Sequence, residues 1–467
     1  MTATVLIMWP LIAVLICLKR PMQFGLIWAT IPPYLFLPEA TAINLPGLPD
    51  LSKPNVIALG LLLGLMVAKK EPPIPPEHQD QSVRKFQNFL LGGIFIGGML
   101  TVAANPETIR YGRTVLPGLG LWEGISLMSD LVFLLVPFVL ARKYLVTEDA
   151  IKHLIFALAI SALFYSVLML YEMRFSPQLH RLVYGFHQHH FNQHVRDGYR
   201  PMMFLQHGLW VGFYIFTGVI AAASLWRAGQ GPKWLLAAVW LFVILFFSRN
   251  LGAFAICILS LGLLFFLGRR LKTIAVAAAA ITILIYPALR QSNAIPLDTV
   301  LEVVGSIDRE RMWSLGFRLR NEDELLERAA QKPMFGWAGW GRQHIYSSDG
   351  QKLSVSEGRW TQTIGARGWV GYIFFFGLLT CPALVLILKG RRSNLPALSY
   401  TLAIITTGNL IYMLPNSTLT PVGLLVFGAF AGVVQTIHST SKSQDAVVDH
   451  SFETPSQTQY SRFARKA

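Results

Sequence analysis

The stretch WVGYIFFFGLLTCPALVLIL, residues 369–388, contains no charged side chain. As an α-helix it rises about 1.5 Å per residue, so it is about 30 Å long and long enough to cross the hydrocarbon core of a membrane. The whole chain has the same character, because 53% of its 467 residues are hydrophobic and only 14% are charged. Soluble domains carry about 25% charged residues. The sequence therefore predicts a membrane protein.

Further apolar segments lie on both sides of this stretch, and each is long enough, or nearly long enough, to cross a membrane as a helix. The predicted spans are 4–18, 22–37, 54–68, 86–104, 122–141, 151–171, 203–225, 233–247, 250–268, 272–288, 368–388, 396–413 and 418–437. We predict an all-α polytopic membrane protein with about 12–13 transmembrane helices in one bundle over residues 1–438. Residues 439–467 are rich in Ser, Thr and Gln and are expected to form a disordered tail.

Basic residues in the short loops predict the orientation of the bundle. Alternate short loops carry seventeen Lys and Arg residues on one side and four on the other. Lys and Arg collect on the cytoplasmic side of membrane proteins, so we expect the N-terminus outside and the tail in the cytoplasm. Two long hydrophilic loops, 172–202 and 289–367, then face outward.

These two outer loops carry fifteen basic residues, of which thirteen are Arg. The guanidinium group binds phosphate and carboxylate oxygens through two parallel hydrogen bonds, so the bias toward Arg favours an anionic ligand at the outer surface. The alternative is that these side chains contact lipid headgroups and nearby acidic residues. Arg200 and His207 lie at the entry to a predicted span, and Arg249 lies in a turn between two spans. Ionisable residues at membrane depth are costly and often functional.

Five histidines in the first outer loop raise the question of a metal site. They are His180, His187, His189, His190 and His194. Several imidazoles on neighbouring helical positions could bind a metal, but apart from Asp197 no carboxylate or cysteine stands at a suitable spacing. We therefore predict no metal site and favour a polar helix that contacts sugar and phosphate groups.

The segment KPMFGWAGWGRQHIYSSDGQKLSVSEGRW, residues 332–360, combines glycines, tryptophans and two candidate proton acceptors. Its glycines permit tight backbone turns. The tryptophan faces suit either sugar rings or the membrane surface. Both roles stay open for Trp340, and Trp337 is expected to anchor the loop at the membrane surface. Glu357 and His344 are the candidates for accepting a proton.

The order of several motifs resembles the O-antigen ligase and Wzy-type polymerase family. In that family the large outer loop carries Arg…Trp, then P-x-x-G-x-G, then a polar motif before G-x-x-G. The corresponding stretches here are DRERMWSLGF (308–317), KPMFGWAGWGR (332–342) and SEGRWTQTIGARGWVGY (356–372), preceded by YRPMMFLQHGLWVGF (199–213) and FFSRNLGAFA (246–255). The resemblance covers residues 200–390 and implies an all-helical glycosyltransferase that needs no metal or nucleotide cofactor.

The resemblance also implies roles for single residues. The arginines that face the lipid diphosphate correspond to Arg200 and Arg249, and the arginine before the loop tryptophan corresponds to Arg311 or Arg309. Where many members carry a histidine base, this chain has Glu357, which leaves Glu357, His344 or neither as the proton acceptor. Further residues expected to contact diphosphate or glycan are His207, Arg318, Trp340 and Arg359.

The expected function is polymerisation of undecaprenyl-diphosphate-linked repeat units into exopolysaccharide or O-antigen, on the periplasmic face of the bacterial inner membrane. One alternative is an O-antigen ligase that transfers the glycan to lipid A-core. A transporter or flippase of polysaccharide or lipid is the alternative from another class, although no internal repeat typical of transporters is found. Expected partners are the lipid-linked glycan, an acceptor glycan or lipid A-core, membrane lipids, a chain-length regulator and export proteins, but no nucleic acid.

Overall fold

The computed structural model is almost entirely helical, with helices making up 73% of the chain. It describes residues 2–44, 49–68, 79–189, 198–292, 294–307, 309–389 and 395–437, without the side chains of 307, 310 and 311. The predicted tail lies outside these residues, as do His190, His194 and Asp197. The described strands form two short antiparallel hairpins, β1 (Ala42–Ile43) with β2 (Leu51–Ser52) and β3 (Ile109–Tyr111) with β4 (Thr114–Leu116).

Each of the thirteen predicted spans coincides with a helix. These helices are α1 (Thr2–Lys19), α2 (Met22–Phe36), α3 (Lys53–Val67), α4 (Gln81–Ala103), α5 (Leu121–Tyr144), α6 (Glu148–Phe175), α8 (Gly208–Arg227), α9 (Lys233–Phe247), α10 (Leu251–Phe266), α11 (Arg269–Gln291), α14 (Arg359–Lys389), α15 (Ala397–Tyr412) and α16 (Pro421–Gln435). Within the described residues, seven helices are long and apolar enough to cross a membrane: α1, α4, α5, α6, α8, α11 and α14. The predicted all-α polytopic membrane fold is confirmed.

The centre of the bundle is formed by α8, α15 and α16, whose side chains are nearly all buried. Helices around them expose large apolar side chains instead, such as Leu236 of α9, 72% exposed, and Phe266 of α10, 90% exposed. Water would make such a surface costly, whereas lipid contacts it favourably. The outer helices therefore present a surface suited to a bilayer.

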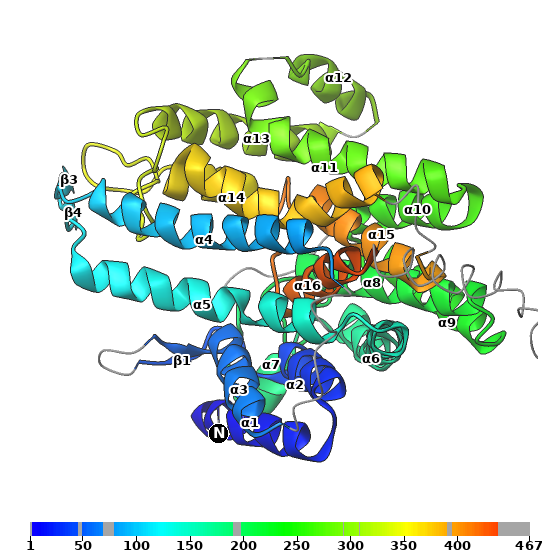
Figure 1. Cartoon of the computed structure of the whole chain (residues 1–467). Coiled ribbons are helices and arrows are strands. Elements are labelled where there is room, and N and C mark those ends of the chain that lie inside the picture. Colours follow the sequence, from blue (N-terminus) through cyan, green and yellow to red (C-terminus); the bar gives the residue numbers. More distant parts are fainter. Residues whose placement is uncertain are drawn as a thin grey trace, which may run out of the picture.

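Loops that were predicted to share a side of the membrane meet in the structure. At one end of α4, α5 and α14, the β3–β4 hairpin contacts the loop 331–358, drawn in yellow (Figure 1). At the other end, Lys389, the last residue of α14, pairs with Asp80 before α4, and Arg142 of α5 donates to Asn88 of α4 (2.8 Å). These contacts agree with the predicted alternation of the loops between the two ends of the bundle.

Three helices lie in the two long loops. They are α7 (Leu179–Tyr184), α12 (Leu297–Ile307) and α13 (Arg309–Ala330). Helix α13 packs against α14 on one flank of the bundle (Figure 1), and its Asp323 pairs with Arg290 in the last turn of α11 (2.7 Å). The large outer loop is therefore mostly helical.

One predicted span begins later than expected. The span 203–225 becomes a helix only at Gly208, because Met203 has φ 46°, a conformation outside the right-handed helical region. The backbone N–H groups of Met202 and Met203 donate to the buried carboxylate of Glu172 (2.8 and 2.7 Å), and His207 caps the helix by accepting the N–H of Leu209 (3.1 Å). The segment before α8 is thus an ordered loop that carries Arg200.

Candidate functional site

Helix α14 is broken at Gly368, which determines the shape of the site. Gly368 has φ 61° and ψ −167°, a conformation that is essentially limited to glycine. A β-carbon there would lie 2.4 Å from the carbonyl oxygen of Met334. The predicted span began at 368, whereas the helix begins nine residues earlier, at Arg359. The break separates a polar first part, 359–367, from the apolar stretch that follows.

The segment 333–338 lies against this break and bonds the backbone groups that the break frees. The N–H of Trp369 donates to the carbonyl of Pro333 (2.8 Å), and the N–H of Trp337 donates to the carbonyl of Gly365 (2.9 Å). A broken helix inside a membrane protein needs such partners, because water is not available to replace them. The glycine-rich motif therefore serves as the backbone partner of α14.

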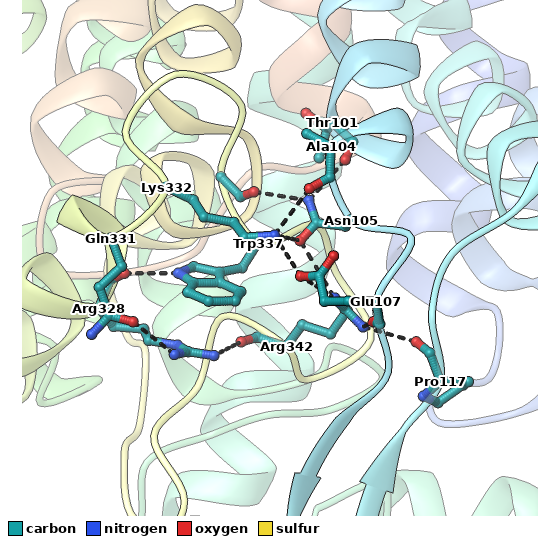
Figure 2. A network of polar contacts seen from close by, with 11 residues as sticks. Thr101, Ala104, Asn105, Glu107, Pro117, Arg328, Gln331, Lys332, Trp337 and Arg342 are labelled. Atoms are coloured by element: carbon teal, nitrogen blue, oxygen red, sulfur yellow. Dashed lines mark hydrogen bonds and ion pairs between the residues drawn. The ribbon is translucent and has the colours of Figure 1, made fainter.

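A polar network holds the same motif against the end of α4 and the following loop (Figure 2). Lys332 donates to Asn105 Oδ1 (2.9 Å) and to the Glu107 carboxylate (2.5 Å). The buried guanidinium of Arg342 donates to the Glu107 carbonyl (3.0 Å), to the Glu107 carboxylate (3.1 Å) and to the Pro117 carbonyl (2.8 Å). Burial of the Glu107 carboxyl opposes ionisation, but Lys332 and Arg342 hold its pKa below the usual value.

The tryptophans of the motif differ in their surroundings. Trp337 is buried, its Nε1 donates to the Arg328 carbonyl (2.7 Å), and the Arg328 guanidinium lies 3.4 Å from its ring centroid (Figure 2). The expectation that Trp337 anchors the loop at the membrane surface is therefore wrong, because the network encloses it. Trp360 is fully buried, whereas Trp340 is 47% exposed. Trp340 alone of these three offers a free face.

A polar cavity of about 490 Å³ lies between the loop 343–356 and the first part of α14. Five of its lining residues, at positions 359, 362, 363, 366 and 367, recur at helical spacing and form one face of α14. Polar side chains that line it include Gln343, His344, Lys352, Arg359, Gln362 and Arg367.

The cavity is positively charged. Arg359, Arg367 and Lys352 line it, and no carboxylate does. Among the described residues, neither arginine forms an ion pair, and the buried Nε of Arg359 has no hydrogen-bond partner. Asp130 of α5 acts on Arg367 electrostatically without such contact. Uncompensated buried charge is costly, so this arrangement is suited to an anionic ligand that supplies the missing partner.

His344 forms part of the cavity wall and is a weak base. Its side chain is buried, and its Nδ1 lies 3.2 Å from Ser354 Oγ. Burial, and then the nearby charge of Lys352, lower the pKa of His344 to about 4. The imidazole is therefore neutral at pH 7 and takes up a proton only weakly.

Glu357 directly follows one cavity-lining residue in the sequence, Ser356, and precedes another, Arg359, by two positions. Its Oε2 atom is 2.6 Å from Nε of Arg318 on α13. About a third of each of these two side chains is exposed, so the carboxylate keeps access to solvent or substrate. Within the described residues the ion-pair partner of Glu357 is Arg318 and not the nearby Arg359.

A second group of basic residues gathers around the loop before α8. Arg200 packs its stem against Gly208, and its buried Nε has no partner in the described part of the chain. Burial, and then Arg200, His189 and Arg318, lower the pKa of His207 to about 4. His207 is therefore neutral at pH 7, and the structure brings it together with Arg200 and Arg318.

Arg249 reaches the same loop from the α9–α10 turn. It has φ 59°, an uncommon conformation for a residue other than glycine. A β-carbon on Gly198 would lie 2.8 Å from its guanidinium, so Arg249 points at the backbone two residues before Arg200. The strained turn thus directs the arginine toward the loop.

Tyr412 at the end of α15 joins the two groups. Its hydroxyl accepts a hydrogen bond from Asn250 in the α9–α10 turn (2.8 Å). Tyr412 also interacts electrostatically with the guanidinium of Arg200. The next residue, Met413, accepts the backbone N–H of Arg359 (3.0 Å). The Arg200 loop and the cavity are therefore neighbours at one end of the bundle.

Three predicted site residues are not brought into this arrangement. Arg309 is exposed at the start of α13, nine residues, or about 13 Å, from Arg318 along the helix and on its opposite face. The side chain of Arg311 lies outside the described residues. Trp340 lines neither the cavity nor the network.

The prediction missed Arg367, Lys352 and Gln362 as lining residues. For Gln362 and Arg367 the signal was the helical spacing of polar residues over 359–367, which a span boundary at 368 hides, whereas Lys352 lies in the loop before the helix. His180, which was considered as a metal ligand, instead bonds the N–H of Glu39 (3.1 Å) and the carbonyl of Phe186 (2.8 Å). Both of its ring nitrogens are therefore engaged within the fold.

No model of a known protein family matches the sequence, and no curated protein matches it. The resemblance to the O-antigen ligase and polymerase family therefore rests on the motifs quoted above.

Proposed function

We propose that the protein is a membrane glycosyltransferase that polymerises undecaprenyl-diphosphate-linked repeat units. The observation that carries the proposal is the cavity with two arginines, Arg359 and Arg367, that have no ion-pair partner among the described residues. A diphosphate is the anionic group that suits two guanidinium groups. The motifs around the cavity, which resemble those of lipid-diphosphate-dependent transferases, support this ligand.

The arginines supply the electrostatic part of the reaction. The acceptor oxygen attacks the anomeric carbon of the donor sugar, and the bond from that carbon to the diphosphate oxygen breaks. The diphosphate leaves with the bonding electron pair, so negative charge grows on it. Fixed positive charges beside a leaving group stabilise this charge without reorganisation. Arg359 and Arg367 take this role, with Arg200 and Arg249 at the neighbouring loop.

Glu357 is the group we assign to accept the proton of the attacking hydroxyl. Its carboxylate is paired with Arg318 (2.6 Å) and remains partly exposed, so a substrate hydroxyl can reach it. His344 is less suited, because its side chain is buried against Ser354.

The proposal includes the cellular setting. The fold spans a membrane, and the excess of basic residues in alternate short loops favours a bacterial inner-membrane location with the cavity on the periplasmic side. A ligase that transfers the glycan to lipid A-core would use the same donor site and differ only in the acceptor. Expected partners remain the lipid-linked donor, an acceptor glycan, a chain-length regulator and export proteins.

The proposal is tested by the surface polysaccharide of a deletion strain that carries plasmid copies of the gene. We expect wild type to restore high-molecular-weight polysaccharide, and Arg359→Ala, Arg200→Ala and Arg249→Ala to leave lipid-linked single repeats. The matched control is Arg320→Ala, an exposed arginine on α13, which should restore the polymer.

Two outcomes would redirect the proposal. Polymer that forms but is not joined to lipid A-core in the deletion strain would indicate a ligase. Unchanged polysaccharide in the deletion strain would remove the glycosyltransferase function. All variants must be present in the membrane at wild-type amounts, so that loss of polymer reports on the site and not on insertion.

A further inference from the structure

A second, smaller cavity lies on the other side of His344, whose side chain lines both cavities. This second cavity has a volume of about 210 Å³. Its lining comes from three segments: Tyr111 on β3; Glu324, Glu327 and Arg328 on α13 with Gln331 just after it; and His344, Ile345 and Tyr346 in the loop after the glycine-rich motif. The residues that line this cavity lie outside the motifs that carry the family resemblance.

The two tyrosines form an aromatic surface. The rings of Tyr111 and Tyr346 stack with centroids 5.0 Å apart and an angle of 18° between their planes. The Tyr346 hydroxyl donates to the Gly341 carbonyl (3.1 Å), which fixes this ring to the loop. Aromatic surfaces contact the apolar C–H faces of sugar rings and leave the ring hydroxyls for polar groups.

The two glutamates supply those polar groups. Glu324 and Glu327 are three residues apart and share one face of α13. Neither forms an ion pair within the part of the chain that the structure describes. Carboxylates accept hydrogen bonds from hydroxyl groups but repel phosphate. Arg328 also lines this cavity, but the two carboxylates outnumber it, so the net charge of the cavity is negative, opposite to that of the arginine-lined one.

We propose that this second cavity binds one uncharged sugar ring of the acceptor glycan. That the bound sugar belongs to an acceptor rests on the proposed glycosyltransferase function. That the cavity binds a sugar at all rests on its lining residues. The volume is below the ~300–1,000 Å³ of sites for larger ligands, which fits a single ring rather than an extended chain. The acceptor would then lie across His344 from the diphosphate of the donor.

The test is direct binding of glycan to the full chain purified in detergent. The probe is a mixture of oligosaccharides released by mild acid hydrolysis from the surface polysaccharide of the source organism, and binding is measured by saturation-transfer NMR and titration calorimetry. We expect wild type to bind. We expect Tyr111→Ala and Glu327→Gln to weaken binding at least tenfold, because each removes a direct contact.

Two variants act as controls. Glu302→Gln, which changes an exposed carboxylate on α12, should bind like wild type. Arg359→Ala should lose transfer of glycan and keep binding, since it lines only the other cavity. No binding by wild type, or unchanged binding by Tyr111→Ala and Glu327→Gln, would overturn the subsite. Wild type that binds oligosaccharide but transfers none would instead overturn the proposed function and leave the subsite standing.

Discussion

At the scale of single residues, positive charges inside the outer end of the bundle fall into two kinds. Arg342 and Lys332 donate hydrogen bonds to Glu107 and nearby carbonyls, so they hold the loop in place. Arg359 and Arg200 form no ion pair and no side-chain hydrogen bond among the described residues. Sequence alone predicted an excess of arginine but could not separate these kinds, because the partners come from distant segments.

Removing the structural arginine should destabilise the fold. Arg342→Ala removes a buried guanidinium that donates to the carbonyls of Glu107 and Pro117, each bond worth about 0.5–1.5 kcal/mol, and to the Glu107 carboxylate, worth about 1.5–3 kcal/mol. We expect a clear fall in the thermal unfolding midpoint of the purified protein. Arg320→Ala, at an exposed position on the nearby α13, should leave the midpoint unchanged. Equal midpoints for the two variants would show that the network contributes little.

Glu322 on α13 should make stability depend on pH. Burial raises the pKa of its carboxyl to about 7, although Arg290 lies 3.6 Å away. Because the folded value is above the unfolded one, the folded chain binds the proton more tightly, and stability falls as pH rises from about 4.5 to 7. Over this pH range the free energy of unfolding falls by about 3 kcal/mol.

Thermal unfolding measured between pH 4.5 and 7.5 tests this dependence. Glu322→Gln should remove that part of the decline and be the more stable protein above pH 7. Glu302→Gln, at an exposed site on α12, should decline like wild type. A decline in Glu322→Gln as steep as in wild type would assign the effect to other groups.

At the scale of elements, hydropathy was enough to locate thirteen helices, of which seven are long and apolar enough to cross a membrane. It misplaced the starts of α8 and α14. Before α8, Met203 has φ 46°, which the right-handed helix does not allow. In α14, the turns over 359–367 carry two arginines and look like loop, yet they are helical because the segment 333–338 bonds the break at Gly368.

The break itself gives a prediction with a control in the same helix. Gly368→Ala places a β-carbon 2.4 Å from the Met334 carbonyl and strains the backbone. We expect the segment 333–338 to separate from α14, which lowers the unfolding midpoint and exposes the loop to limited proteolysis. At Gly377 a β-carbon meets only ordinary contact, 3.4 Å from Leu90. Gly377→Ala should therefore behave like wild type, and equal behaviour of both variants would mean that the break is not required.

At the scale of the whole molecule, the loops meet at two ends, and the candidate site lies at the end that charge counting predicts to face outward. The sequence gives this alternation through its hydropathy and Lys and Arg bias. It does not give the joining of the Arg200 loop to the cavity, which depends on Tyr412 and Met413 from a helix two hundred residues away.

Orientation can be measured with single cysteines. Ser348→Cys lies exposed in the outer loop and Gln230→Cys lies exposed between α8 and α9, while the native cysteines are buried. We expect a membrane-impermeant maleimide to label Ser348→Cys in spheroplasts, and to label Gln230→Cys only after the membrane is opened. The reverse pattern would place the cavity in the cytoplasm.

The most direct measurement is turnover of donor by the purified protein in liposomes that contain undecaprenyl-diphosphate-linked repeat units. We expect longer glycans and released undecaprenyl diphosphate with wild type and with Arg320→Ala, and neither product with Arg359→Ala. Donor that stays uncleaved in the presence of wild type, or that merely crosses the bilayer intact, would contradict the proposed glycosyl transfer and favour a transporter.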